Sequence, residues 1–256
     1  MSCPFAHHVR QIRLLFGLED IFEITFASGQ TAEDGFIFAS PEPEFGSSSL
    51  KQIYKKTLPD YEGEATVPAI VDRTDGSMVS HESLEAAIAL ARQGKTDDLD
   101  LLPPGTIELA TDISDKVTIA LYKILFNPDA TAKAAIASDL WAEFENYNKL
   151  LSTQPLLMGE KLSLPDCVLW ATVIRYDDMY ARQFGIQGRS ILTDYPHLAA
   201  FAKRMWNIPT KSDPSKTIGD DVNMSEVLRM YWQSENLAPR SGNDPTAPVP
   251  EEVPIF

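Results

Sequence analysis

Thr66-Val67-Pro68-Ala69-Ile70-Val71, followed by Asp75-Gly76 and then by Met78-Val79-Ser80, is the stretch that decides the fold. Both apolar runs favour β-strands, and Asp-Gly between two such runs is typical of a tight hairpin turn. Over residues 82–93 apolar residues recur at helical spacing, and Gly94 supplies a stop. The stretch therefore predicts two paired strands followed by a helix.

The residues before this unit predict a helix, a strand, a loop and a second helix. Apolar residues recur at helical spacing from Pro4 to Phe16, and Gly17 follows them. Apolar and polar residues alternate over residues 22–26, which predicts a half-buried strand. Residues 28–49 are rich in glycine, serine, proline and acidic residues and predict a loop, whereas residues 50–56 predict a short helix.

The order helix, strand, helix, strand, strand, helix is that of an α/β thioredoxin-like domain without its first strand. We expect residues 1–94 to form this domain. The missing strand normally lies in the middle of the sheet and leads into the helix that here begins at Pro4. We therefore expect the sequence to be truncated at its N-terminus.

The second half of the chain predicts an all-α domain. Residues 95–106 are polar and carry prolines, as expected of a linker, and residues 107–236 form the domain. Its expected helices cover residues 107–126, 130–151, 164–184, 195–206 and 224–234. The tail, residues 237–256, holds five prolines and is expected to lie extended over a surface.

The composition limits the partners and the compartment of the protein. Acidic residues outnumber basic ones, 37 against 22, which disfavours nucleic acid as a partner. The longest apolar runs are far shorter than the ~20 residues of a membrane span, so we expect no membrane insertion. The two cysteines make no disulfide framework, and no leader is recognisable. We expect a cytoplasmic protein, with an organelle left open because the N-terminus looks truncated.

Cys3 stands in the run Met1-Ser2-Cys3-Pro4-Phe5-Ala6-His7-His8, directly before the first expected helix. A helix N-terminus stabilises negative charge, which predicts a lowered pKa for a thiol held there and hence a reactive thiolate. Pro4 suits the first helical position, because its fixed φ and missing N–H cost nothing there. The alternative interpretation is a small buried thiol without chemistry.

Val67-Pro68 and Glu82-Ser83 each allow a structural and a ligand-binding interpretation. A proline that opens a strand is tolerated at a sheet edge. In a thioredoxin-like domain it is usually cis, and its neighbour offers backbone groups to a peptide-like ligand. Glu82 and Ser83 can cap the helix, or Ser83 and nearby N–H groups can bind a carboxylate while Glu82 pairs with an ammonium group. The γ-glutamyl end of glutathione carries both groups, so the two pairs, taken together with Cys3, predict a glutathione site.

Other polar residues predict structure more than chemistry. Ser163 and Asp166 are expected to form a capping box before an apolar helix, which makes Cys167 a core residue. His7 and His8 diverge on a helix and no further ligands have metal spacing, so we expect no metal site. Most tyrosines are expected in the core or an interface. A subset facing Cys3 would donate hydrogen bonds to a phenolic or quinone oxygen, but no pattern selects that subset.

Four motifs of the chain are similar to motifs of one enzyme family. Cys3 to His8 is similar to CPWAHR, and Thr66-Val67-Pro68 to TVP. Ile174 to Tyr180, IRYDDMY, closely resembles IRFDxVY, and Asp194 to Leu198, DYPHL, resembles DYPNL. The family is that of the xi-class glutathione transferases, the glutathionyl-hydroquinone reductases. The resemblance spans nearly the whole chain and implies the glutathione transferase fold, a thioredoxin-like domain followed by an all-helical one.

The resemblance also implies an activity. The enzyme would be a cysteine-dependent transferase that removes glutathione from glutathionyl-hydroquinones, which are hydrophobic quinone-type conjugates. Cys3 would attack the sulfur of the conjugate and form a Cys3–glutathione mixed disulfide, which a second glutathione would resolve. Glutathione is therefore the expected co-substrate, and a homodimer is the expected assembly.

Two sets of site residues follow from the resemblance. Glutathione would be held by Phe36, Val67, Pro68, Glu82 and Ser83. The aromatic substrate would lie among Tyr122, Tyr180 and Tyr231, whose hydroxyls would steady the developing phenolate. The chain departs from the family at three positions, where His8 replaces an arginine, Phe36 a tryptophan and Met230 a histidine.

Two other functions stay open at this point. An omega-like or lambda-like thioltransferase would use the same cysteine on other glutathione conjugates and mixed disulfides. A transferase-like protein without catalysis would bind ligands or partners. The absent first strand favours this second alternative, because that strand would hold the Cys3 helix in place.

Overall fold

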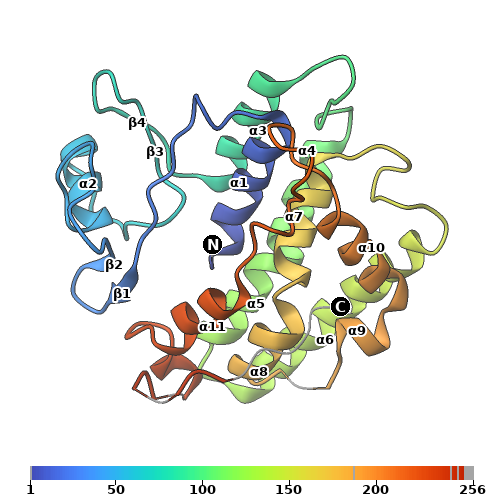
Figure 1. Cartoon of the computed structure of the whole chain (residues 1–256). Coiled ribbons are helices and arrows are strands. Elements are labelled where there is room, and N and C mark those ends of the chain that lie inside the picture. The colour runs from blue at the N-terminus through green and yellow to red at the C-terminus, as the bar shows by residue number, and fades with distance from the viewer. Residues whose placement is uncertain (1, 187, 243, 247, 251–256) are drawn as a thin grey trace.

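The structure is a computed structural model of the chain and describes residues 2–186, 188–242, 244–246 and 248–250 (Figure 1). Within these residues the only sheets are two antiparallel ribbons of two strands each. The first pairs β1 (Gly29–Thr31) with β2 (Gly35–Ile37), with Gln30 opposite Phe36. The second pairs β3 (Ile70–Val71) with β4 (Met78–Ser80), with Ile70 opposite Ser80.

Helix α1 (Pro4–Phe16) lies at the centre of the molecule. Pro4 occupies the first helical position, and Gly17 ends the helix in the left-handed conformation with φ 65°. The helix packs against α3 (Ser83–Gly94) and α7 (Leu164–Val173). In Figure 1 the ribbons and α2 (Leu50–Thr57) form a separate lobe on its other side. The predictions of helices over residues 4–16, 50–56 and 82–93 are confirmed.

Two predictions for the first domain are wrong. Residues 22–26 form no strand; they are extended, and within the described structure no strand lies alongside to pair with them. Residues 28–49, expected to be a loop, contain the β1–β2 hairpin, in which Gly35 adopts a left-handed φ of 65°. The strand predicted over residues 66–71 is confirmed only at its end, where β3 pairs with β4.

A cavity of about 820 Å³ lies between the N-terminal part of the chain and residues 221–230 near its C-terminus. Its walls include residues of α1, residues 21–27, residues 67–73 and, on α11 (Met224–Trp232), Glu226 and Met230. Residues 22–26 border this cavity and have no paired strand within the described structure, and a strand needs a neighbour at hydrogen-bonding distance.

The rest of the chain is helical, as predicted. Its elements are α4 (Thr106–Ile113), a π-helical turn η1 (Ser114–Thr118), α5 (Ile119–Phe126), α6 (Ala130–Leu151), α7, a second π-helical turn η2 (Tyr176–Tyr180), α8 (Ala181–Gln183), α9 (Ile191–Asp194), α10 (Pro196–Trp206), α11 (Met224–Trp232) and the short 3₁₀ helix η3 (Pro239–Ser241). Among the described helices, none is long and apolar enough to cross a membrane.

The helix predictions for this half differ from the structure in detail. Residues 130–151 form α6 as predicted, whereas the expected helices 107–126 and 164–184 are each interrupted by a π-helical turn. The helix over residues 191–194 was not predicted. The tail, expected to be extended, forms η3 over residues 239–241; its residues 243, 247 and 251–256 lie outside the described part. The domain boundaries at residues 94 and 107 stay a prediction.

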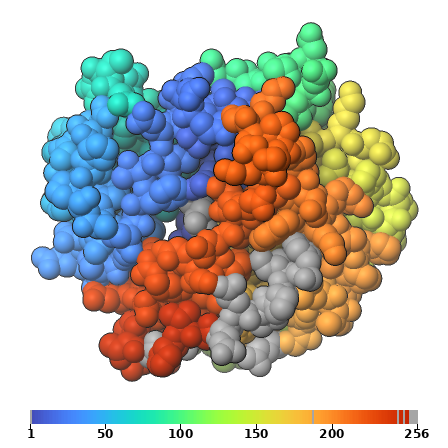
Figure 2. All heavy atoms as spheres, viewed as in Figure 1, coloured from blue at the N-terminus to red at the C-terminus, as the bar shows by residue number. Residues whose placement is uncertain are grey.

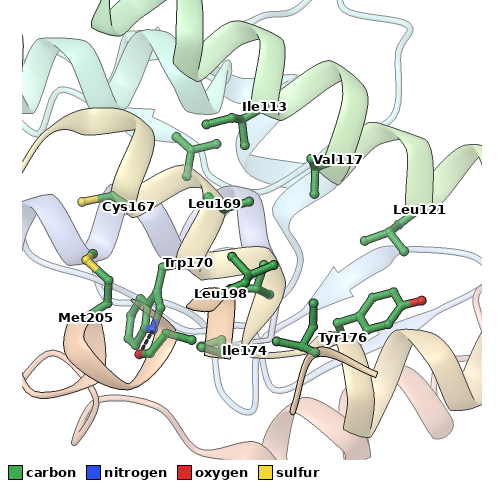
Figure 3. Close-up of a cluster of buried hydrophobic side chains, with 14 of the residues drawn as sticks. Ile113, Val117, Leu121, Cys167, Leu169, Trp170, Ile174, Tyr176, Leu198 and Met205 are labelled. Carbon is green, nitrogen blue, oxygen red and sulfur yellow. Dashed lines mark hydrogen bonds between the residues drawn. The ribbon is translucent and has the colours of Figure 1, made fainter. Parts of the chain in front are cut away.

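The core is built around α7, of which all ten residues are buried. Figure 3 shows Trp170 of α7 beside Met205 of α10, and the indole N–H donates to the Ala202 carbonyl oxygen at 2.9 Å. The predicted capping box is confirmed, because the Ser163 N–H donates to the Asp166 carboxylate at 2.9 Å. Cys167 follows it, fully buried, so its assignment to the core is confirmed too.

The C-terminal elements close back on the N-terminal part. In the space-filling view the orange-to-red end of the chain lies against the blue N-terminal residues (Figure 2). Arg229 on α11 donates to the Ser28 carbonyl oxygen at 2.9 Å, and Arg10 on α1 forms an ion pair with Asp221. These contacts hold α11 and the segment that leads into it against α1 and against the residues before β1.

A candidate active site around Cys3

Cys3 lies at the N-terminal cap of α1, next to the second ribbon. Its backbone is extended, with φ −71° and ψ 127°, and its side chain is partly buried. The Sγ atom lies 3.9 Å from the Val67 carbonyl oxygen, although the two residues are 64 positions apart. The Val67-Pro68 peptide bond is cis, as the sequence analysis expects. The fold therefore places the thiol beside the extended backbone that precedes β3.

The expected glutathione residues fall into two groups. Phe36, Val67 and Pro68 line the same cavity as Cys3. Glu82 and Ser83 lie instead at the start of α3, where Glu82 is the N-terminal cap and Ser83 the first residue. The Glu82 side chain is largely exposed, and within the described structure it makes no capping hydrogen bond. Within the described residues its carboxylate lies 3.6 Å from His81 Nδ1 at the surface, where a ligand can reach it.

Three tyrosines meet near Cys3, whose charge raises the pKa of each. Tyr122 on α5 and Tyr231 on α11 share a hydrogen bond between their hydroxyls. The ring of Tyr180, at the end of η2, lies 6.4 Å from that of Tyr122 and 6.2 Å from that of Tyr231. Phe5, next but one to Cys3, packs against Tyr122 with 5.6 Å between ring centroids. The structure thus brings together the three tyrosines expected to hold an aromatic substrate.

The remaining tyrosines of the helical region lie elsewhere. Tyr176 accepts a hydrogen bond from the Trp141 indole at 2.7 Å, and Tyr195 packs against Phe144. Tyr147 is buried in the same core. The subset beside Cys3 is therefore Tyr122, Tyr180 and Tyr231.

Known proteins share this architecture. A family model described as glutathione S-transferase, C-terminal domain, matches residues 130–204. Glutathionyl-hydroquinone reductase YqjG of Escherichia coli is 26% identical over 94% of this chain and 75% of its own length. PcpF of Sphingobium chlorophenolicum, also a glutathionyl-hydroquinone reductase, is 25% identical over 97% of this chain and 80% of its own. The crystal structure of glutathione-S-transferase Xi from Phanerochaete chrysosporium superposes with a TM-score of 0.85 at 27% identity, covering 99% and 89% of the two chains.

The chain is a homologue of the xi-class glutathione transferases. It therefore has the glutathione transferase fold, as the sequence analysis expects. The family model covers only part of the helical half, whereas the two curated relatives match 94% and 97% of this chain.

One expectation about Cys3 is wrong in this xi-class homologue. Burial raises the pKa of the Cys3 thiol above its ordinary value. The backbone amides of Ala6 and Phe5, at the first turn of α1, and the charge of Arg175 all lower that pKa, but burial outweighs them. The helix N-terminus therefore lowers the pKa of Cys3 as predicted, but the cost of removing the thiolate from water raises that pKa by more.

The tyrosine hydroxyls are hydrogen-bond donors in this site. Burial raises the pKa of Tyr122, Tyr180 and Tyr231, and the nearby Cys3 raises each of them further. The three phenols therefore stay protonated at neutral pH. An oxygen atom that becomes negative beside Cys3 would meet protonated hydroxyls and not phenolates.

Arg175 is the site residue that the sequence analysis did not assign. It follows α7 in the IRYDDMY motif and is fully buried. Its Nε donates to the Ser2 carbonyl oxygen at 2.9 Å, and its Nη1 lies 3.0 Å from His7 Nδ1. The available signal was an arginine directly after a run of buried apolar residues, where a charge is costly.

The adjacent histidines have different partners. His7 faces Arg175, whereas His8 interacts with the backbone of Ser83 at the start of α3. Both imidazoles are buried, and burial lowers the pKa of His8 to about 4. Both are therefore neutral at pH 7, and His8 joins the Cys3 helix to the helix that begins at Ser83.

Proposed function

We propose that this enzyme of the glutathione transferase kind removes glutathione from glutathionyl-hydroquinones with Cys3 as its nucleophile. The observation that carries the proposal is the position of the Cys3 thiol. It lies 3.9 Å from the Val67 carbonyl oxygen, and it is near enough to Tyr122, Tyr180 and Tyr231 to raise the pKa of each. A conjugate of a peptide-like group and an aromatic group would contact both the Val67 backbone and these tyrosines.

The peptide part of the conjugate would bind along the N-terminal side of the site. The backbone of Val67 would pair with the extended cysteinyl part of glutathione, with Phe36 and Pro68 against it. Ser83 and the first N–H groups of α3 would bind the γ-glutamyl carboxylate, because a helix N-terminus favours an anion. The exposed carboxylate of Glu82 would pair with the ammonium group.

The first chemical step would transfer the glutathionyl group to Cys3. The thiolate attacks the sulfur atom of the conjugate, the new S–S bond forms, and the bond from sulfur to the aromatic carbon breaks. That carbon takes up a proton, so the aromatic product leaves as the hydroquinone. The two sulfur atoms are oxidised to the disulfide level while the aromatic ring is reduced.

The tyrosine hydroxyls would stabilise this step. Tyr122, Tyr180 and Tyr231 are buried and protonated, so they can donate to a hydroquinone oxygen whose negative charge grows as the ring is released. Donors that are fixed in place before the reaction need little reorganisation, which is why they lower a barrier more than water does.

A second glutathione would complete the cycle. Its thiolate attacks the Cys3–glutathione disulfide, releases oxidised glutathione and restores the Cys3 thiol. Cys167 is fully buried in the α7 core and does not take part. The resolving thiol would therefore come from solution.

The expected homodimer, the cytoplasmic location and the division into domains 1–94 and 107–236 belong to this proposal and rest on the resemblance. The proposed chemical steps do not depend on any of the three. Size-exclusion chromatography with light scattering tests the homodimer, and limited proteolysis within residues 95–106 tests the division.

The proposal is tested by supplying glutathionyl-menadione with glutathione and measuring release of the menadione product. A glutathione mixed disulfide of a small alkyl thiol serves as the competing substrate. We expect a higher kcat/KM for the aromatic conjugate. A preference for the alkyl disulfide would favour an omega-like thioltransferase. A relative from Schizosaccharomyces pombe named glutathione S-transferase omega-like 2 is 25% identical over 97% of this chain and 83% of its own length. No turnover of either would favour a binding protein.

A further inference from the structure

Arg175 connects the turn that carries Cys3 to the central helix of the core. Its Nε donates to the carbonyl oxygen of Ser2, the residue directly before Cys3, at 2.9 Å. Its Nη1 lies 3.0 Å from His7 Nδ1, one turn into α1, and also donates to the Ala171 carbonyl oxygen of α7. One guanidinium group therefore binds both sides of Cys3 and holds them against α7.

His7 is suited to this contact. Burial and the nearby Arg175 lower the pKa of His7 well below its ordinary value, so the imidazole is neutral. A neutral imidazole can accept a hydrogen bond at Nδ1 from the guanidinium, whereas a protonated one would repel it. The backbone N–H of His7 donates to the Cys3 carbonyl oxygen at 3.0 Å. The turn that carries Cys3 is therefore held by this backbone bond and by the contacts of Arg175 with Ser2 and His7.

The guanidinium group also lies near the Cys3 thiol, the group that becomes negative in the reaction. The titratable groups around it come from several elements: Cys3 and His7 on α1, Tyr122 on α5, Tyr180 on η2 and Tyr231 on α11. Arg10 and His8 on α1 also face this region. A buried positive charge favours an anion near it, because the low dielectric of the interior strengthens the attraction.

We propose that Arg175 is a positioning residue that holds the Cys3 turn on α7 and supplies the positive charge against which the Cys3 thiolate forms. The proposal deepens the function proposed above and rests on it for the role of Cys3 as nucleophile. It assigns two separable properties to one side chain. The forked donor set fixes the geometry of the turn, and the charge sets the fraction of thiolate.

The two properties are separated by three variants. Arg175→Lys keeps the charge but cannot bind Ser2 and His7 at once with a planar fork. Arg175→Gln keeps a donor group without the charge, and Arg175→Met removes both. Lys216→Gln, which removes an exposed positive charge far from Cys3 in sequence, is the matched control.

The measurement is the rate of Cys3 alkylation by iodoacetamide as a function of pH, without substrate or glutathione. This readout reports the thiolate directly, so it does not depend on the identity of the substrate. Cys167 is fully buried and serves as an internal check, because its alkylation would indicate unfolding. Turnover of the best substrate is measured on the same samples.

We expect Arg175→Gln and Arg175→Met to alkylate several-fold more slowly at pH 7, with the pH profile moved to higher pH, because the loss of the positive charge raises the pKa of the Cys3 thiol. Arg175→Lys should alkylate within about twofold of the parent protein but lose kcat by about tenfold or more, because the turn is no longer fixed. Lys216→Gln should match the parent protein in both assays.

Parent-like alkylation profiles in the neutral variants would overturn the role of the charge. If the neutral variants do not fold, Arg175→Lys decides alone. An alkylation profile moved to higher pH although the charge is kept would overturn that role, and a parent-like kcat would overturn the positioning role. A failure of the proposed function would give a different result. The alkylation profiles would still differ between the variants, but neither the variants nor the parent protein would turn over the conjugate.

Discussion

The hydroxyl groups of Tyr122 and Tyr231, 109 residues apart in the chain, are hydrogen-bonded to each other beside Cys3. The contact joins α5 to α11 and depends on the C-terminal elements closing over the start of α1. It concentrates phenolic donors near a thiol that also lies 3.9 Å from the Val67 carbonyl oxygen. The site is therefore assembled from both halves of the chain.

Removing either hydroxyl should impair turnover of the aromatic conjugate. We expect Tyr122→Phe and Tyr231→Phe each to lower kcat/KM by about 10- to 100-fold, because each removes one donor to the developing oxyanion. The double variant should lose less than the product of the two single losses, since the hydroxyls are bonded to each other. Steady-state kinetics checks this. Tyr147→Phe, in the core away from Cys3, is the control, and its kcat/KM should stay within about twofold of that of the parent protein. If Tyr122→Phe and Tyr231→Phe were as active as Tyr147→Phe, the role of the pair would be contradicted.

The reactivity of Cys3 should depend strongly on alkaline pH. Burial raises the pKa of the thiol, so in the free enzyme the thiolate is the minor form at neutral pH. Because the thiolate reacts and the thiol does not, the alkylation rate should keep rising with pH beyond about 8.5, the ordinary pKa of a cysteine. Rates measured from about pH 6 to about pH 10 test this. A plateau already reached below neutral pH would mean that the amides and Arg175 outweigh burial.

Stability should fall in acid because of His8. Burial lowers its pKa from 6.5 to about 4 in the folded state. The unfolded chain therefore binds a proton first as the pH falls, and stability that is fully present above about pH 6.5 is lost toward pH 4. The loss from this group is about 3 kcal/mol.

Urea unfolding at several pH values measures this loss. His8→Gln, which stays neutral throughout, should lose about 3 kcal/mol less than the parent protein between about pH 6.5 and about pH 4. His197→Gln changes an exposed histidine and should follow the parent curve. Parallel curves for His8→Gln and the parent would show that His8 carries no such linkage.

Asp166 should be among the most sensitive positions for folding. Its carboxylate accepts hydrogen bonds from the Ser163 N–H at 2.9 Å, the Ser163 hydroxyl at 2.6 Å and the Leu157 N–H at 2.8 Å, all buried. Asp166→Ala would leave these donors without an acceptor and should cost about 3 kcal/mol or more in the free energy of unfolding. Asp166→Asn, which keeps one acceptor oxygen, should cost less. Asp139→Ala, on the exposed face of α6, should change the free energy of unfolding by only about 0.5 kcal/mol. A similarly small change for Asp166→Ala would contradict the stabilising role of the Asp166 hydrogen bonds.

Local patterns were sufficient for most of the helices. The helices over residues 4–16 and 130–151 carry their own apolar period and their own ends, Pro4 and Gly17 in the first case and Asp129 in the second. The strand predicted over residues 22–26 did not form, because a strand depends on a partner and the described structure has none paired with these residues, which border the cavity. The π-helical turns also escaped prediction, since they leave the apolar pattern almost unchanged.

The candidate site also contains residues that local patterns identified and residues that they did not. Cys3, Val67-Pro68 and Glu82-Ser83 each stand at a recognisable start of an element, so their types and positions could be read locally. Tyr122, Tyr180 and Tyr231 were named only through the resemblance, because six tyrosines share the helical region and only packing selects among them. The net pKa of Cys3 could not be predicted, since it depends on how deeply the whole chain buries the thiol.

The most direct test of the central claim is the mass of the intact protein after one turnover. The enzyme is mixed with an equal amount of glutathionyl-menadione without free glutathione, quenched with acid, and analysed by mass spectrometry with peptide mapping. We predict one glutathionyl group on Cys3, formed in step with release of the aromatic product, in the parent protein and in Cys167→Ala but not in Cys3→Ser. Product release by Cys3→Ser at the parent rate, or release without an adduct on Cys3, would contradict the mechanism.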